Sequence, residues 1–231
     1  MKKYLFLALA LLGLTPAFGQ TDDDDAIFNS STIGKPRNYA IHVGPRIGFT
    51  TTSMTQPLEC DLYDGMGLGF SAGASMKVRL GHMSENSDGG TGLLGFGLDL
   101  KYKQNKVKTI GDSDLSLGYF EVPVMLQLYP FYKITKLNGL YVEAGVDMAG
   151  TLSKSPDLLT VLQPTGRVVY HTGDLKGFDC RIPIGLGYTL RNGFDVNLRY
   201  YIGTSELAEN MPCKMSSMEL SLAWLFKAGK K

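Results

Sequence analysis

Eight segments of this chain alternate residue by residue between apolar side chains and polar or small ones. In residues 119–129, for example, Phe120 and Val122 alternate with Glu121 and Pro123. A period of two places successive side chains on opposite faces of an extended strand, so each segment predicts a β-strand with one apolar face. The expected strands cover about residues 39–51, 66–80, 92–104, 119–129, 139–151, 177–190, 194–203 and 216–227. The sequence therefore predicts an all-β fold.

Charged side chains occur on only one face of these expected strands. The polar faces carry Arg46, Lys77, Arg79, Lys101, Lys103, Arg181 and Arg199 together with Asp99, Glu121, Glu143, Asp147, Asp179, Asp195 and Glu219. In a soluble, lipocalin-like barrel the apolar face would line a ligand cavity and the charged face would meet water. In a transmembrane barrel the apolar face meets hydrocarbon and the charged face lines the lumen. Alternation alone fits both kinds of barrel.

Three further features favour the membrane. The connections after the first, third, fifth and seventh expected strands are on the whole longer than the others, as in barrels with long extracellular loops and short periplasmic turns. Aromatic residues gather at the short-turn end, which predicts a girdle at one interface: Tyr39, Tyr129, Phe131, Tyr132, Tyr141, Tyr188, Phe194, Trp224 and Phe226. The last strand closes on Trp224 and Phe226, near the C-terminus. We therefore predict an eight-stranded antiparallel up-and-down transmembrane β-barrel.

The N-terminal residues indicate export. A short basic start is followed by an apolar run and by Ala17-Phe18-Gly19, a pattern that signal peptidase cleaves. No later stretch reaches the roughly 18 to 20 apolar residues that a spanning helix needs, so a membrane-bound mature chain would have to cross with strands. The four aspartates Asp22–Asp25 predict a flexible acidic arm, and consecutive side chains diverge too much to favour a metal site. The expected organisation is a signal peptide at 1–19, an arm at 20–38 and a barrel at 39–228.

Composition excludes some functions. Lys and Arg total 23 against 22 Asp and Glu, so no basic surplus indicates nucleic acid as a partner. The 28 glycines recur inside apolar segments, which fits strands bending around a closed barrel. Cys60, Cys180 and Cys213 lack metal-binding spacing. Cys60 and Cys213 fall in the first and last long connections, which become neighbours when the barrel closes, so they are candidates for a disulfide.

Several motifs resemble one family. They are Tyr119-Phe120-Glu121-Val122-Pro123-Val124-Met125-Leu126, Gly139-Leu140-Tyr141-Val142-Glu143-Ala144-Gly145, Gly185-Leu186-Gly187-Tyr188 and Leu198-Arg199-Tyr200. Together they are similar to the PorT-like family of outer-membrane β-barrel proteins, over about residues 39–226. The resemblance implies a small barrel in a Gram-negative outer membrane. The family's namesake is tied to protein secretion across that membrane, most members have no assigned role, and the family supplies no catalytic motif.

The charged lumen is expected to be structural. At eight strands a barrel interior is about filled by side chains, and its buried charges need partners, so we expect interlocked ion pairs and no open pore. Glu121 and Glu143 lie on neighbouring expected strands and could act as acid and base. A basic neighbour such as Arg181 or Arg199 between them is the simpler outcome. We predict no catalytic residue, cofactor or metal, and we expect a bulge or bend at Pro123, which lacks a backbone donor.

The connection at 153–176 is the best candidate for contact with a protein partner, because binding usually resides on loops held by a rigid scaffold. It also holds His171 and Asp174, which leave an enzyme open as an alternative; His42 is expected in the lumen and His82 in a turn. The leading interpretation is a non-enzymatic outer-membrane barrel that meets membrane lipid and serves as a structural or interaction component, accessory to a transport or secretion assembly. The alternatives are a small-barrel enzyme and a soluble ligand-binding barrel.

Overall fold

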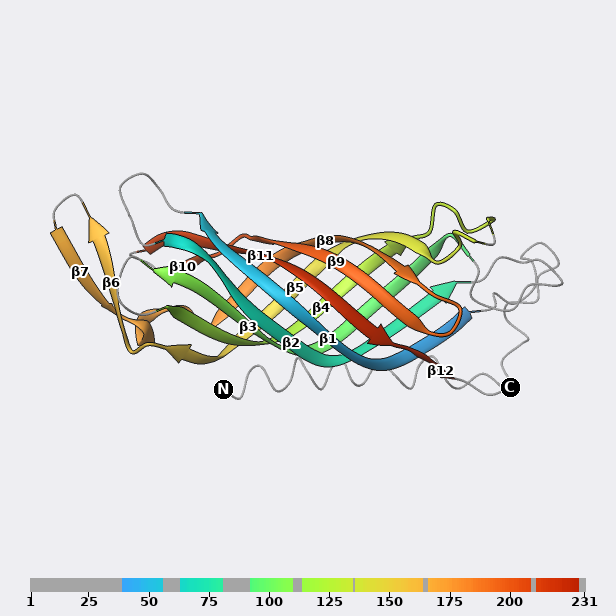
Figure 1. Ribbon diagram of the computed structural model, residues 1–231, viewed down its shortest axis with the longest axis horizontal. Helices are drawn as coiled ribbons and strands as arrows, with labels where there is room; N and C mark the ends of the chain where they lie inside the picture. Colours follow the sequence, from blue (N-terminus) through green and yellow to red (C-terminus); the bar gives the residue numbers. More distant parts are fainter. Residues whose placement is uncertain are drawn as a thin grey trace, which may run out of the picture. The chain divides into compact units, whose positions relative to one another are not determined.

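The computed structural model describes residues 39–55, 63–80, 92–109, 114–134, 136–163, 166–208 and 211–228. In this part of the chain eight long strands form the barrel (Figure 1): β1 (Tyr39–Thr55), β2 (Tyr63–Leu80), β3 (Leu94–Thr109), β4 (Leu115–Leu128), β5 (Leu140–Ser155), β8 (Phe178–Thr189), β9 (Phe194–Gly203) and β11 (Met211–Trp224). Each pairs antiparallel with its neighbours, and β11 pairs with β1. The predicted fold is therefore confirmed. The expected signal peptide and acidic arm lie outside the described residues.

The ladder that closes the barrel, between β1 and the last strands of the chain, contains a short interruption. Strand β12 (Phe226–Ala228) continues the register of β11 along β1 after a break at Leu225. The unpaired stretch lies opposite Gly44 and Pro45. Proline has no N–H to donate, and a Cβ at residue 44 would lie 1.8 Å from the carbonyl oxygen of Trp224. The last predicted strand, residues 216–227, is therefore divided into two collinear strands, β11 and β12.

The expected bulge at Pro123 is absent. The register between β4 and β5 runs unbroken through Pro123, and the one shift along this pair falls between Gly118 and Tyr119. On the other side, the β3–β4 ladder skips the pairs opposite Asp99 and Leu100 and resumes in the same register. Pro183 marks a similar gap between β5 and β8. A missing donor removes pairs from one ladder but requires no extra residue, so no bulge is needed.

The apolar faces of the strands point outward, as a membrane barrel requires. Exposed large apolar side chains include Val43, Leu68, Phe96, Val124, Leu126, Val146, Ile184, Leu198 and Leu220. The charged faces point inward, and most of their side chains are fully buried. This arrangement excludes the soluble-barrel alternative, in which the apolar face would be the inner one. Among the described residues no helix is both long and apolar enough to cross a membrane.

The strands extend further than expected at one end. We call this the ribbon end, where β1 and β2 are joined by 56–62 and β5 and β8 by 156–177; the opposite turn end holds 129–139 and 190–193. β1, β3 and β5 reach Thr55, Thr109 and Ser155, beyond their predicted limits. Most ribbon-end connections are consequently short. The expected asymmetry in loop length is wrong except for residues 156–177.

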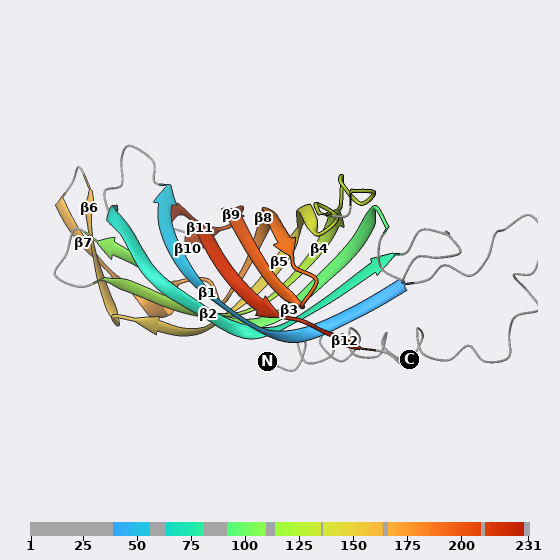
Figure 2. The same ribbon diagram turned by 45° about the vertical axis from the view of Figure 1, so that its right-hand side comes forward.

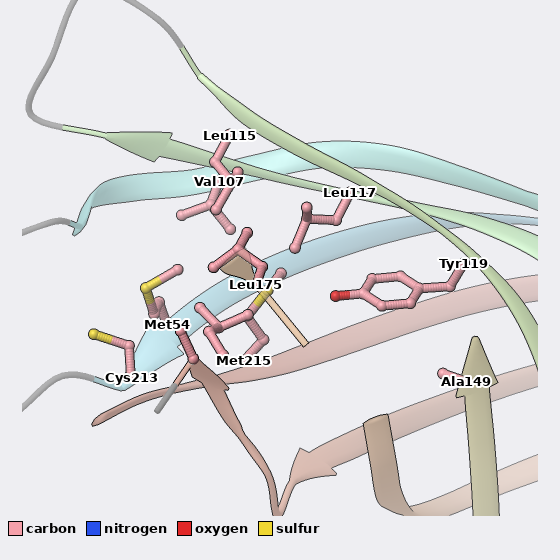
Figure 3. Close-up of a cluster of buried hydrophobic side chains, with 11 residues drawn as sticks. Met54, Val107, Leu115, Leu117, Tyr119, Ala149, Leu175, Cys213 and Met215 are labelled. Atoms are coloured by element: carbon pink, nitrogen blue, oxygen red, sulfur yellow. The ribbon is translucent and has the colours of Figure 1, made fainter. Parts of the chain in front are cut away.

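In these extensions the inward face is apolar and the outward face is polar, the reverse of the arrangement in the lipid-facing part of the barrel. The interior at the ribbon end is an apolar cluster (Figure 3): Met54, Val107, Leu115, Leu117, Tyr119, Ala149, Leu175, Leu207, Ala208, Cys213 and Met215. The outward face there carries Gln104, Lys106 and Lys108 on β3 and Lys214 on β11. A polar exterior around an apolar core is the pattern of a protein in water. The strands therefore continue past the hydrocarbon at this end.

Aromatic residues lie at both limits of the lipid-facing surface. At the turn end Tyr39, Phe131, Phe194, Trp224 and Phe226 are exposed, as predicted for the girdle. A second band, which the sequence reading missed, follows the change of polarity at the ribbon end and contains Phe49, Phe70, Tyr102, Phe120 and Phe178. Tyr129 and Tyr141 were wrongly placed in the girdle: they are 2% and 0% exposed, because both take inward positions.

Residues 153–176 are more ordered than an irregular loop. Strands β6 (Leu158–Gln163) and β7 (Gly166–His171) form a separate two-stranded ribbon that projects beyond the barrel (Figures 1 and 2). The 3₁₀ turn η2 (Thr172–Asp174) follows it, and β10 (Glu206–Ala208) borders β11. Leu175 enters the apolar cluster, and the Lys176 N–H donates to the Leu207 carbonyl over 2.8 Å. The base of the ribbon thus covers one mouth of the barrel.

The position of the membrane predicts how two substitutions on one strand will differ. Val124 and Ser116 both face outward on β4, on opposite sides of the aromatic band. Val124→Arg places a charge in hydrocarbon and should lower the free energy of unfolding by about 2–4 kcal/mol. Ser116→Arg loses only a hydrogen bond from Gln104 and should cost about 1 kcal/mol or less. Urea titration of the barrel folded in lipid vesicles measures both, and equal losses would contradict the assigned boundary.

Candidate functional site

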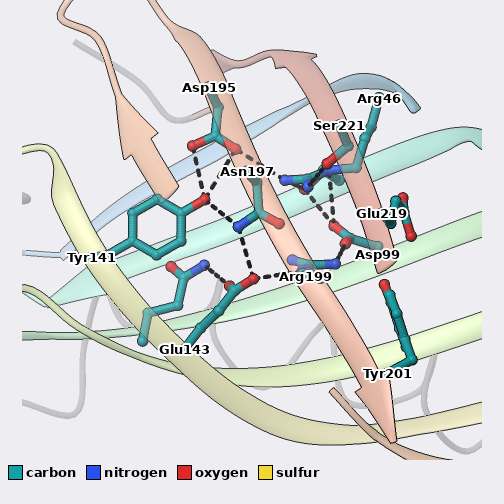
Figure 4. A network of polar contacts seen from close by, with 12 residues as sticks. Arg46, Asp99, Tyr141, Glu143, Asp195, Asn197, Arg199, Tyr201, Glu219 and Ser221 are labelled. Carbon is teal, nitrogen blue, oxygen red and sulfur yellow. Dashed lines mark hydrogen bonds and ion pairs between the residues drawn. The ribbon is translucent and has the colours of Figure 1, made fainter. Parts of the chain in front are cut away.

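The lumen holds a polar layer between the two ends of the barrel (Figure 4). Arg46, Lys77, Lys101, Lys103, Arg181 and Arg199, with Asp99, Glu121, Glu143, Asp147, Asp195 and Glu219, are each 5% exposed or less. Arg79 and Asp179, nearer the two mouths, are partly exposed. All fourteen predicted lumen charges thus lie on the inward face, because alternate residues of a strand point to the same side of the sheet.

Asp195 organises the part of the layer nearest the turn end. Its carboxylate accepts a hydrogen bond from Lys77 Nζ over 2.6 Å and one from Arg46 Nη2 over 3.0 Å. The hydroxyl of Tyr141 also donates to Asp195 and accepts from Asn197 Nδ2 over 2.9 Å. These groups come from β1, β2, β5 and β9, so a single carboxylate ties four strands together across the lumen.

Arg199 links two carboxylates at the centre of the layer. Its guanidinium contacts Asp99 on β3 and Glu143 on β5. Glu143 also accepts hydrogen bonds from Gln127 and Asn197, both over 2.8 Å. Charge-assisted hydrogen bonds of this kind are about twice as strong as neutral ones. The centre of the lumen is therefore occupied by a connected network.

Two clusters complete the layer toward the ribbon end. Glu219 contacts Lys101 and Lys103, and Lys103 Nζ lies 3.5 Å from the centre of the Tyr201 ring. Arg181 lies among three carboxylates, which come from β4, β5 and β8. Its Nη2 is 2.8 Å from Glu121, and its Nε is 3.5 Å from Asp147 and 3.2 Å from Asp179.

Every lumen carboxylate therefore has a cationic partner. Arg79, the one lumen cation without a carboxylate in these contacts among the described residues, lies 3.8 Å from the centre of the Tyr129 ring and donates to the carbonyl of Gly92. Buried charges are costly unless they are paired, so this pairing lowers the cost of holding ionisable side chains inside the barrel. Side chains fill the lumen, as predicted for an eight-stranded barrel.

Glu121 and Glu143 are not brought together. In the β4–β5 ladder Glu121 lies opposite Ala149, whereas Glu143 lies opposite Gln127. Each carboxylate has its own arginine, Arg181 for Glu121 and Arg199 for Glu143, instead of the one basic neighbour expected between them. Sequence reading missed that Asp147 shares Arg181 with Glu121. Only the register could have revealed it, because it places Asp147 on β5 directly opposite Arg181 on β8.

The other candidate residues form no site in the described part of the chain. His171 ends β7 and Asp174 lies in η2, and both side chains are exposed without an ion pair between them. His42 is half-buried on β1. The described residues contain no group of three or more His, Cys, Asp or Glu that could hold a metal ion. Cys60 and His82 lie outside the described residues, so the Cys60–Cys213 disulfide stays a prediction.

The chain is similar to known barrel proteins. A family model described as an outer membrane protein β-barrel domain matches residues 20–209. Among solved structures, Ail of Yersinia pestis is 12% identical with a TM-score of 0.40, covering 80% of this chain and 98% of Ail. Neisserial surface protein A is 12% identical (TM-score 0.42; 80% and 97% covered), as is OprG from Pseudomonas aeruginosa (0.42; 85% and 98%). No curated protein sequence matches the chain.

The network predicts different costs for removing two lumen arginines. Arg199→Met leaves Asp99 and Glu143 buried without their shared cation, and loss of one partner of a buried pair costs about 3–5 kcal/mol. Arg79→Met removes a cation that is partly exposed and stacks on Tyr129, and should cost about 1 kcal/mol. Comparing the temperatures at which each barrel loses its heat-modifiable gel mobility measures the difference. An Arg199→Met variant as stable as Arg79→Met would show that the network is not needed for stability.

Proposed function

This chain belongs to the family of outer-membrane protein β-barrel domains and is a protein of the outer membrane; from that premise we propose that it acts there as a non-enzymatic structural or interaction component. The observation that carries the proposal is the contrast between lumen and ribbon. The lumen is filled by paired charges, which leaves little room for a substrate or an ion path. The ribbon of β6 and β7 stands outside the barrel, where a partner can reach it.

The ribbon is the proposed contact surface for a protein partner. Leu158 and Val169 are 50% and 55% exposed, although both are apolar. A two-stranded ribbon alone is marginally stable in water, so contact with a partner would stabilise it. Its base is fixed, since the Thr172 N–H donates to Asp157 over 3.0 Å and the Thr172 hydroxyl to Pro156 over 2.6 Å. An adaptable element on a rigid base is a common arrangement for recognition.

The finer assignment is membership of the PorT-like group, with a role accessory to a transport or secretion assembly. The motifs at 119–126 and 139–145 support it, and both lie in β4 and β5 or beside them. Residues 1–19 would act as the signal peptide and residues 20–38 as a flexible acidic arm. The longest connection of the barrel, residues 156–177, lies at the ribbon end. Long connections are extracellular in bacterial barrels, so this one connection supports an outward-facing ribbon end and a periplasmic turn end.

Lipid is the other proposed partner. The outward apolar side chains between the two aromatic bands would contact acyl chains directly, as the outer surface of an outer-membrane barrel does. The enzyme alternative gains no support in the described residues. His171 and Asp174 are exposed and not paired with each other, whereas a catalytic base is normally oriented by a hydrogen-bonded neighbour.

Complementation separates the interaction role from the enzyme alternative. In a strain lacking the gene, a chain whose residues 158–171 are replaced by a short Gly-Ser link should fail to restore the lost secretion. A His171→Ala/Asp174→Asn chain should restore it fully. Outer-membrane fractionation and heat-modifiable mobility on a gel check that both chains fold and insert. Full activity of the ribbon-deleted chain would contradict the proposed contact surface, and loss of activity in the double substitution would favour the enzyme.

A further inference from the structure

A hollow opens at the turn end, the end of the barrel opposite the ribbon. It has a volume of about 650 Å³ and is lined by Lys136, Asn138, Tyr188, Thr189, Leu190, Arg191 and Asn192. One wall comes from connection 129–139 and the other from the end of β8 and the hairpin turn at 190–193. Volumes of about 300–1,000 Å³ are typical of sites for small ligands.

Hydrogen bonds hold the two walls in place. The Tyr188 hydroxyl donates to the Lys136 carbonyl over 2.7 Å, and the Thr189 N–H donates to the Gly139 carbonyl over 2.9 Å. The turn at 190–193 is closed by a 2.7 Å bond from the Leu190 N–H to the Phe194 carbonyl, and Gly193 has the positive φ of 91° that such a turn requires. The hollow is therefore already formed without a ligand.

The hollow lies at the level of the turn-end aromatic girdle. The Leu225 N–H donates to the Gly193 carbonyl over 2.8 Å, which ties the hairpin to the last strand beside Trp224. The rings of Phe194 and Trp224 stack at 5.4 Å next to it. Aromatic girdles mark the headgroup region of a bilayer, so the hollow faces lipid headgroups.

Its lining combines positive charge with apolar surface. Lys136 and Arg191 supply two exposed cationic side chains, Asn138 and Asn192 supply amide donors, and no acidic residue is among the described residues that line the hollow. Leu190, which is exposed, continues the lipid-facing surface of β8. We propose that this hollow binds the headgroup of an anionic phospholipid from the leaflet at the turn end.

The geometry favours a lipid over a soluble anion. A free phosphate would use only the cations and the amides, whereas a phospholipid also places the start of its acyl chains against Leu190 and Tyr188. Each basic side chain near a membrane surface strengthens binding of an anionic lipid about fivefold. The headgroup would bridge the 129–139 connection and the β8–β9 hairpin, and so brace the turn end of the barrel.

Native mass spectrometry of the full chain in detergent tests this site. Titration with phosphatidylglycerol and with phosphatidylcholine of the same acyl chains should show at least about fivefold tighter binding of the anionic lipid. The Lys136→Ala/Arg191→Ala variant should lose that preference. A matched Lys133→Ala/Lys227→Ala variant removes two exposed cations of the same end that do not line the hollow, and should keep it. Heat-modifiable mobility confirms that each variant is folded. Lys136→Gln/Arg191→Gln replaces the Lys136→Ala/Arg191→Ala variant if that variant is not folded, and Lys133→Gln/Lys227→Gln replaces the control in the same way.

Three results would overturn the proposal. The first is an unchanged preference for the anionic lipid in the Lys136→Ala/Arg191→Ala variant. The second is an equal loss in the Lys133→Ala/Lys227→Ala variant, which would show only a general charge effect. The third is complete displacement of the lipid by millimolar inorganic phosphate, which would show a site for a free anion. Retained preference in the charge-conserving Lys136→Arg/Arg191→Lys variant would support the proposal.

Discussion

Every backbone N–H and C=O group within hydrocarbon must find a partner in the protein, and the closure of β11 onto β1 meets this requirement. An open sheet would leave two edges of unpaired groups, each costing several kcal/mol in lipid. The prolines show how closely the fold follows this rule. Pro45, Pro123 and Pro183 each coincide with a local gap in one ladder, and in none does the register change across the gap. The barrel therefore stays closed although three prolines each lack a backbone N–H donor.

Closure also decides what the charged faces can do. Once the sheet is a barrel, the inward side chains of opposite strands meet across the lumen, and fourteen charges must neutralise one another in a small volume. Asp195 and Arg199 show the result, since each contacts side chains from several strands. The filled lumen leaves the outer surface and the two ends for function. The ribbon and the turn-end hollow both lie there.

Several details were beyond sequence reading for one physical reason. The sequence places Glu143 and Asp147 on the inward face of β5, but it does not tell how far along the neighbouring strands their partners lie. Glu121 and Glu143 were therefore considered as a pair, although the β4–β5 register separates them. The β5–β8 register instead brings Asp147 to Arg181, which also pairs with Glu121. The extensions at the ribbon end were missed for a similar reason. Their apolar residues, such as Leu115 and Leu117, look like lipid-facing positions when they are read alone. They lie an even number of positions from the inward-facing Glu121 along β4, however, and so they face the interior as well.

The sequence by itself determined the number of long barrel strands, the face on which each charge lies and the membrane as the surrounding solvent. The strand count and the charged faces follow from a period of two, which acts locally along the chain. The membrane was indicated by the aromatic residues at the turn end and at the end of the last strand. Only the tertiary structure decided which charges pair, where the bilayer ends at the ribbon end and how residues 153–176 fold. These depend on strand register and on contacts between residues far apart in sequence, and alternation within one strand carries no information about either.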